Sequence, residues 1–221
     1  MIGDRELAAL AAIEDFVGDD SAFRHRIALI EAKLSGVAVE DTPKVAADVG
    51  VTEELLQGAM LIKSLAGQVN VVIHAAGIVL SLPHVLAPGE RVMSLSLGAG
   101  NTGRDWDLET DQQIAEFKLI RWKGRDAIRQ STLFVDVFHL AEAQTEKRRV
   151  LYLTGLDWPL RFLNGRRKIT SVLEKHGNVM SKFAGIYGAN YTWTCDYWQA
   201  VRSRIELVDL EVIVPGLARL A

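Results

Sequence analysis

The sequence predicts a protein of the α/β class, with a helical N-terminal region and a mostly helical C-terminal extension. From residue 67 to residue 175 the patterns follow the order helix, strand, strand, strand, helix, strand. Apolar residues make up 49% of the 221 residues and charged residues 24%, which is ordinary for a globular protein. A chain of this length can bury one good core and a small second one. We therefore expect a helical region at 1–66, an α/β core at 67–175 and an extension at 176–221.

The first 66 residues are predicted to form helices that serve interaction or dimerisation. Helical patterns occur at 4–18, 21–35, 42–49 and 52–66. The segment 46–52 places a glycine between two of them and is similar to a helix-turn-helix connection, although a plain helical hairpin fits the same pattern. Residues 1–66 carry twelve acidic and six basic residues, a balance that opposes a DNA-facing surface.

A long apolar segment follows, in which no charged residue occurs between Lys63 and Glu90. Its most apolar part, 68–87, is nearly long enough to span a bilayer. Polar residues within it favour instead a helix buried between the layers of one domain, without contact to a membrane. In that arrangement His74 and His84 are core or rim residues with satisfied hydrogen bonds rather than metal ligands.

A strand pattern at 91–97 precedes a glycine-rich connection at 98–103. The connection matches GxGxxG, which binds dinucleotides when a helix follows it. An acidic segment of strand character follows here instead, so a flexible connection between two strands fits better. Glycines in this place would also let a phosphate backbone approach closely.

The most informative pattern is a hairpin in which acidic and basic side chains share one face. Side chains alternate between the faces of a strand, so Glu116 and Lys118 lie on the same face. If Asp111 and Gln112 form a two-residue turn, Asp107 lies directly opposite Glu116, with Cβ atoms roughly 4.5–5.5 Å apart. That separation lets two carboxylates share one divalent cation.

The turn sequence does not fix this register, because it lacks an Asn-Gly or Asp-Gly pair. A longer loop is compatible with it, and a one-residue slip would turn one set of side chains to the other face. Asp105 and Glu109 share a face with Asp107 and are the reserve ligands in that case. A solvated surface hairpin with cross-strand ion pairs is the alternative interpretation.

A helix is predicted over 125–146 and a buried strand over 149–155. Apolar side chains of the helix recur from Phe134 at the spacing i, i+3, i+4 and i+7. Gln130 extends this stripe by one turn toward the N-terminus, so it should face the sheet near Glu116. A strand, a helix and a strand in this order imply a right-handed parallel crossover.

Asp107 followed by Glu116-x-Lys118 resembles the signature of the PD-(D/E)xK, or restriction-endonuclease-like, nuclease superfamily. The order of elements over roughly 68–165 is similar to the αβββαβ core of that fold. Gln130 together with Phe134 resembles the Gln-x-x-x-Tyr element of the RecB-like branch, with Phe in place of Tyr.

The resemblance implies a metal-dependent nuclease. Asp107, Glu116 and the carbonyl of Phe117 would hold Mg²⁺, or Mn²⁺ in its place. Lys118 would assist the attacking water. Gln130 would support the site or contact nucleic acid.

The chain departs from the family pattern in two places. Phe134 lacks the hydroxyl of the family's tyrosine, which removes a polar role at this position. The superfamily often carries an acidic residue on the first core helix, and none occurs at 68–86. The second departure weakens any mechanism with two metal ions.

Basic residues concentrate near the proposed site, although the net charge of the whole chain is −3. Residues 118–175 contain thirteen Lys or Arg and six Asp or Glu. Such a region is expected to bind the phosphates of nucleic acid. The resemblance to the nuclease superfamily implies DNA in preference to RNA. The candidate nucleic-acid contacts are Arg104, Arg121, Lys123, Arg129, Arg166 and Arg167.

Other features bear on setting and on the alternative function. The single cysteine, Cys195, cannot form an internal disulfide, so a reducing compartment, the cytoplasm, is expected. Aromatic residues cluster at 187–198, where they either cover the core, form an oligomer contact or stack on bases. The alternative function is a catalytically inactive nucleic-acid-binding or regulatory protein on the same fold.

Overall fold

The computed structural model describes residues 4–18, 20–98, 105–214 and 216–217. The chain divides into two compact units, Met1–Asn70 and Val71–Ala221. The boundary between them falls within the long helix α4, Glu53–Val85. Of the glycine-rich connection, residues 99–103 lie outside the described residues, and so does Arg104.

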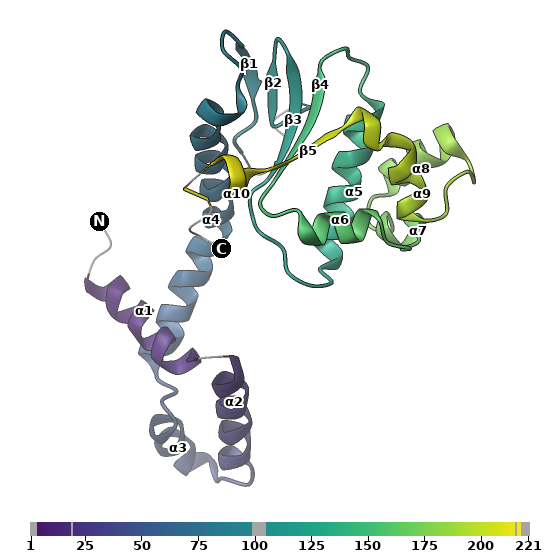
Figure 1. Ribbon diagram of the computed structural model, residues 1–221. Helices are drawn as coiled ribbons and strands as arrows, with labels where there is room; N and C mark the ends of the chain where they lie inside the picture. Colours follow the sequence, from purple (N-terminus) through teal and green to yellow (C-terminus); the bar gives the residue numbers. More distant parts are fainter. Residues whose placement is uncertain (1–3, 19, 99–104, 215, 218–221) are drawn as a thin grey trace. The chain divides into compact units, whose positions relative to one another are not determined.

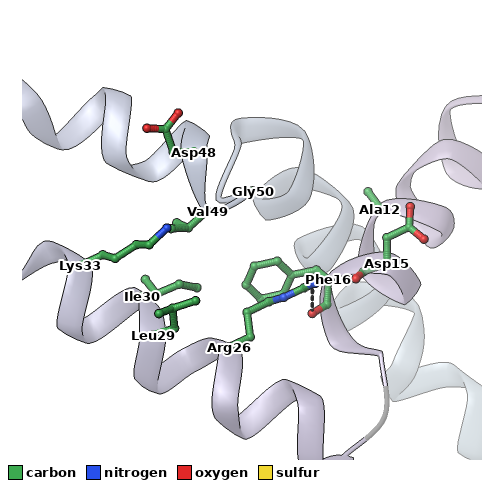
Figure 2. Close-up of a pocket in the computed structure, with 10 residues that line it drawn as sticks. All are labelled: Ala12, Asp15, Phe16, Arg26, Leu29, Ile30, Lys33, Asp48, Val49 and Gly50. Carbon is green, nitrogen blue, oxygen red and sulfur yellow. Dashed lines mark hydrogen bonds between the residues drawn. The ribbon is translucent and has the colours of Figure 1, made fainter.

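The first unit is helical, as the sequence predicts. It contains α1 (Asp4–Val17), α2 (Asp20–Leu34), the 3₁₀ turn η1 (Val39–Asp41), α3 (Thr42–Asp48) and the beginning of α4. Arg26 of α2 closes the end of α1, because its Nη1 donates hydrogen bonds of 2.7 Å to the carbonyl oxygens of Asp15 and Phe16. A helix leaves the carbonyls of its last turn without internal partners. Figure 2 shows Arg26 beside a hollow of about 460 Å³ lined by α1, α2 and α3.

Apolar side chains of the first unit remain exposed. Within the described residues, every buried apolar side chain that builds a core lies at Ile78 or later. Leu7, Leu56 and Met60 are examples of exposed apolar side chains before that point. Exposed apolar surface is typical of interaction sites, and the interaction or dimerisation role of this unit stays a prediction.

The helix α4 is exposed over most of its length, so the prediction of a helix buried between two layers is wrong. Only 17% of its most apolar window of 18 residues is buried. Ile78, Ser81 and Val85 form the buried stripe, whereas Leu80 is exposed. A helix that packs on one face of a sheet buries only the stripe that faces the sheet. Length and composition alone would also let α4 cross a membrane, which is weak evidence because core helices share these properties.

The second unit is a mixed α/β structure built on one five-stranded sheet (Figure 1). Across the sheet the strands follow the order β1 (Val92–Leu95), β2 (Leu108–Thr110), β3 (Gln113–Lys118), β4 (Arg148–Leu153) and β5 (Glu206–Asp209). The pairs β1–β2 and β2–β3 are antiparallel, and the pairs β3–β4 and β4–β5 are parallel. Helix α5 (Ala127–Glu142) connects β3 to β4. The predicted order of helix, three strands, helix and strand is therefore observed from α4 to β4.

The C-terminal extension is mostly helical and supplies the fifth strand. It contains α8 (Gly177–Tyr187), α9 (Thr194–Val201), the 3₁₀ turn η2 (Arg202–Arg204) and α10 (Leu210–Ile213). The short helices α6 (Asp157–Leu163) and α7 (Ile169–Val172) precede the extension and follow β4. Asp209 ends β5 and caps α10, because its Oδ1 accepts a hydrogen bond of 3.0 Å from the backbone nitrogen of Glu211. Tyr197 and Trp198 are buried, which places these two aromatic residues in the core.

Separate apolar clusters cover the two faces of the sheet. One cluster joins α4 and α10 to the strand residues Leu108, Ala115, Phe117, Val150 and Tyr152. The other joins α5 and the helices α6 to α9 to the strand residues Ile114, Leu151 and Leu153. Because strand side chains alternate between faces, Glu116 and Lys118 lie on the face that α5 covers.

A polar network holds the two-residue turn between β2 and β3. Thr110 Oγ1 accepts hydrogen bonds from the backbone nitrogens of Gln112 and Gln113, at 3.0 and 2.8 Å, and donates one of 2.5 Å to Glu90 Oε1. Gln113 Nε2 donates to the same Glu90 oxygen at 2.8 Å, and the Tyr152 hydroxyl donates to Gln113 Oε1 at 2.8 Å. The side chains of Thr110 and Gln113 are fully buried. The network fixes the hairpin register, because leaving a buried polar group unpaired is costly.

The variant Thr110→Val tests this network, since valine keeps the shape of threonine and removes the hydroxyl. We expect the free energy of unfolding to fall by about 1–3 kcal/mol, the cost of leaving a buried polar group unpaired. Urea unfolding followed by circular dichroism measures the change. Thr170→Val, at an exposed threonine of α7, is the matched control. Equal stability of the two variants would show that the hydroxyl does not hold the turn.

Candidate functional site

The hairpin has the register that a two-residue turn predicts. Strands β2 and β3 pair Leu108 with Ala115. The next residues along the ladder, Asp107 and Glu116, therefore lie opposite each other. Lys118 is one side-chain step further along β3 and shares the face of Glu116. The acidic and basic residues selected from the sequence are thus brought together at one edge of the hairpin.

Asp107 is oriented by the backbone of β3 and by a histidine of α4. The backbone nitrogen of Phe117 donates to Asp107 Oδ2 at 2.9 Å, and His74 Nε2 lies 3.2 Å from Oδ1. Burial opposes ionisation of Asp107, but the hydrogen bonds from His74 and Phe117 lower its pKa overall. The hydrogen bond to Asp107 in turn raises the pKa of His74. Asp107 is therefore a carboxylate at neutral pH.

Glu116 keeps a proton at neutral pH. Burial, together with the nearby carboxylates of Asp136 and Asp107, raises the pKa of Glu116 to about 10. The ammonium of Lys118 opposes this effect without cancelling it. A carboxyl group that is protonated because negative charge surrounds it can exchange the proton for a metal cation, which supplies the missing positive charge.

Lys118 forms an ion pair with Asp136 of α5. The distance from Nζ to Oδ2 is 2.6 Å. Burial lowers the pKa of Lys118, but the charge of Asp136 and its neighbours outweighs burial and raises the pKa overall. Burial raises the pKa of Asp136, and Lys118 opposes this rise.

Two residues of the cluster, His74 and Asp136, have no place among those selected from the sequence. The sequence assigns His74 to the core or its rim, whereas the half-buried ring contacts the site carboxylate Asp107. His84 is exposed and takes no part. A signal for Asp136 exists, because it is the single charged residue in the apolar run 133–138. A lone carboxylate within such a run needs a partner once the helix packs on the sheet.

The donor atoms suit a hard divalent cation. Asp107 and Glu116 supply carboxylate oxygens. In a strand, the N–H and the C=O of one residue point toward the same neighbouring strand. The N–H of Phe117 donates to Asp107, so the carbonyl of Phe117 also points toward Asp107. Within the described residues no group of three or more His, Cys, Asp or Glu side chains is arranged to hold a metal. Mg²⁺ still fits, because one or two carboxylates commonly bind it and water completes its shell.

The two reserve ligands, Asp105 and Glu109, have different surroundings from Asp107. Glu109 Oε1 pairs with Lys147 Nζ at 2.8 Å, and Asp105 is exposed. The register therefore favours Asp107 as the carboxylate that acts with Glu116.

Gln130 is engaged away from the carboxylate cluster. It is buried on α5, as its place on the apolar stripe predicts, and its Oε1 accepts a hydrogen bond from Arg167. Gln130 also lines a cavity of about 560 Å³ with Arg166 and Arg167. Its side-chain contact therefore links it to the arginines of that cavity rather than to Lys118.

Five of the six predicted nucleic-acid contacts lie within the described residues, in three settings. Arg121 and Arg129 are ion-paired, with carboxylates at 3.4 Å and 2.8 Å respectively. Arg166 and Arg167 line the cavity beside α5. Lys123 is exposed. Of these five residues, only Arg166 and Arg167 line a common cavity.

A scan against protein families, a search of curated proteins and a search of solved structures find no match to this chain. Its function is therefore inferred from the chemistry of the described residues.

The pKa of Glu116 predicts how stability depends on pH. The folded-state pKa of about 10 lies above the ordinary value of 4.5, so the stabilising contribution is present below 4.5 and is lost as pH rises through 10. We expect the free energy of unfolding of the wild type to fall relative to Glu116→Gln between about pH 5 and pH 9, measured by urea unfolding at each pH. Glu31→Gln, at an exposed glutamate of α2, is the control. A pH-independent difference between wild type and Glu116→Gln would contradict this assignment.

Proposed function

We propose that this chain is a metal-dependent nuclease of the restriction-endonuclease-like superfamily, which hydrolyses phosphodiester bonds and favours DNA over RNA. The observation that carries the proposal is the convergence of Asp107, Glu116 and Lys118 at the β2–β3 hairpin. The order of elements from α4 to β4 supports it, because this order matches the αβββαβ core that the resemblance implies.

Asp107, Glu116 and the carbonyl of Phe117 are the groups that would hold Mg²⁺, or Mn²⁺ in its place. When bound, the metal would polarise the scissile phosphate and lower the pKa of a water ligand. Asp107 is ionised and oriented in advance by His74 and by the Phe117 N–H. Glu116 must release its proton to act as a ligand, so metal affinity should increase with pH.

Lys118 supplies positive charge from the protein. Its raised pKa keeps the side chain an ammonium at neutral pH. In this position it orients the attacking water and stabilises negative charge that develops on the phosphate oxygens. Asp136 positions the ammonium, which has three N–H groups and so keeps donors for a phosphate oxygen or a water.

The charge distribution supports a nucleic-acid substrate. Residues 118–175 contain thirteen basic and six acidic residues. Attraction between such a region and phosphates is independent of nucleotide sequence. The single cysteine favours a reducing compartment, so we propose that the nuclease acts in the cytoplasm. The exposed apolar side chains of the first unit are proposed to contact a second copy or a protein partner.

A catalytically inactive nucleic-acid-binding or regulatory protein on the same fold is the second candidate. The observation that favours it is the ion pair between Lys118 and Asp136, which engages the ammonium that hydrolysis needs. Only the first candidate cleaves nucleic acid in the presence of metal.

The variants Glu116→Gln and Lys118→Met separate the two candidates. Each should lower Mg²⁺-dependent cleavage by about 10²–10³-fold, because Glu116→Gln removes a metal ligand and Lys118→Met removes the ammonium that stabilises charge on the phosphate oxygens. Cleavage of single-stranded and double-stranded DNA is followed on gels with Mg²⁺, with Mn²⁺ and with EDTA. Glu31→Gln and Lys44→Ala, both at exposed positions of the first unit, are the controls.

Circular dichroism establishes that both site variants are folded. Cleavage that is undiminished in either site variant would defeat the assignment of its residue. DNA binding by the wild type without cleavage, with either metal, would favour the inactive protein.

The variant Asp136→Asn tests whether Asp136 positions Lys118. Loss of this carboxylate removes the main effect that raises the pKa of Lys118, and burial then lowers that pKa. We expect the alkaline limb of the pH–rate profile to move to lower pH. A loss of rate that is equal at every pH would indicate a structural role for Asp136 alone.

A further inference from the structure

The cavity lined by Gln130 lies between α5, α6 and the connection from β3 to α5. Its volume of about 560 Å³ falls within the range of roughly 300–1,000 Å³ that is usual for small-molecule sites. Its arginine and tryptophan lining comes from segments that are distant in sequence and comprises Trp122, Arg125, Trp158, Arg161, Arg166 and Arg167.

The cavity is positively charged, because four arginines and no carboxylate line it. The residues that line it include no Asp or Glu. Within the described part of the chain, none of these four arginines makes an ion pair, whereas Arg121, Arg129 and Arg148 each do. Like charges gathered in one place repel one another unless an anion offsets them. The cavity therefore favours an anionic ligand.

Neutral partners hold three of these four arginines in place. Arg161 Cζ lies 5.1 Å from the ring centre of Trp158, and Arg166 Cζ lies 5.0 Å from the ring centre of Trp193. Arg167 donates to the side-chain oxygen of the buried Gln130. Stacking and an amide contact leave the full charge and several N–H donors of each guanidinium available. The arginines are thus positioned without being neutralised.

Aromatic walls add a surface for a planar group. Trp122 is only 6% exposed, and its Nε1 donates a hydrogen bond of 2.8 Å to the carbonyl of Gly124. Trp158 is half-buried beneath Arg161. Arginine forks match phosphate oxygens, and tryptophan rings stack on bases. Because Trp122 is almost fully buried, Trp158 is the ring that offers surface to a base, beside arginines that match the phosphate.

We infer that this cavity binds the phosphate monoester of a nucleotide, with arginines on the phosphate and the base against tryptophan. A monoester carries a charge of about −1.5 to −2 at neutral pH, more than a backbone phosphodiester, and four arginines favour the larger charge. The source is a phosphorylated strand end or a free mononucleotide. The first source rests on the proposed function. Gln130 of the cavity and Asp136 of the cluster lie about 9 Å apart along the axis of α5.

Binding to the full chain in EDTA tests this inference without any contribution from metal-dependent cleavage. The probes are one internally labelled oligonucleotide with a 5′-phosphate, a 3′-phosphate or hydroxyl ends, and adenosine monophosphate compared with adenosine. We expect the phosphorylated member of a pair to bind about tenfold tighter or more. Preference for a phosphorylated strand end identifies the first source, and preference for the mononucleotide alone identifies the second.

The variants Arg161→Gln and Arg166→Gln, both at exposed side chains, should remove most of this preference, and Arg202→Gln in η2 is the matched control. Equal affinity for phosphorylated and unphosphorylated probes would overturn the proposal. So would an equal loss of preference in Arg202→Gln, because it would indicate general attraction to positive charge. The nuclease proposal can fail while the phosphate preference persists, since cleavage is measured separately.

Discussion

The register of one hairpin decides where the chemistry of this chain can occur. Thr110 and Glu90 hold the two-residue turn, and the Tyr152 hydroxyl ties Gln113 to the neighbouring strand β4. A slip of one residue would turn Glu116 and its neighbours on that face toward α4 and bring the apolar side chains of the opposite face under α5. A buried polar network at the turn therefore determines which side chains meet at the other end of the hairpin.

Charge is the second constraint on the site. The carboxyl groups of Asp107, Glu116 and Asp136 lie near one ammonium, that of Lys118, in a place with little access to water. The excess of negative charge and the burial hold a proton on Glu116. A proton and a divalent cation meet the same electrostatic need, so they compete for this carboxyl group. His74 also contributes to the charge of the site, because its hydrogen bond to Asp107 raises the pKa of the imidazole and so favours its cationic form.

Local rules were sufficient to predict the hairpin part of the site. Alternation along a strand places Glu116 and Lys118 on one face, and the two-residue turn places Asp107 opposite. His74 and Asp136 join the cluster only through the rotation of α4 and α5 about their axes as they pack on opposite faces, which no short pattern encodes. The arginine cavity depends on three distant segments for the same reason. Apolar composition likewise could not show that Ile78 and Val85 of α4 are buried whereas Leu80 is exposed.

The carboxylate cluster and the arginine cavity place opposite charges along one helix, α5. Without a metal ion, Asp107 and Asp136 repel the phosphates that the arginines attract, and the proton on Glu116 only reduces this repulsion. A divalent cation in the cluster, bound as Glu116 releases its proton, would offset this negative charge. A nucleic-acid strand could then lie along both places without crossing an uncompensated negative region. Binding of metal and binding of the strand should therefore strengthen each other by the same factor, because such coupling is reciprocal.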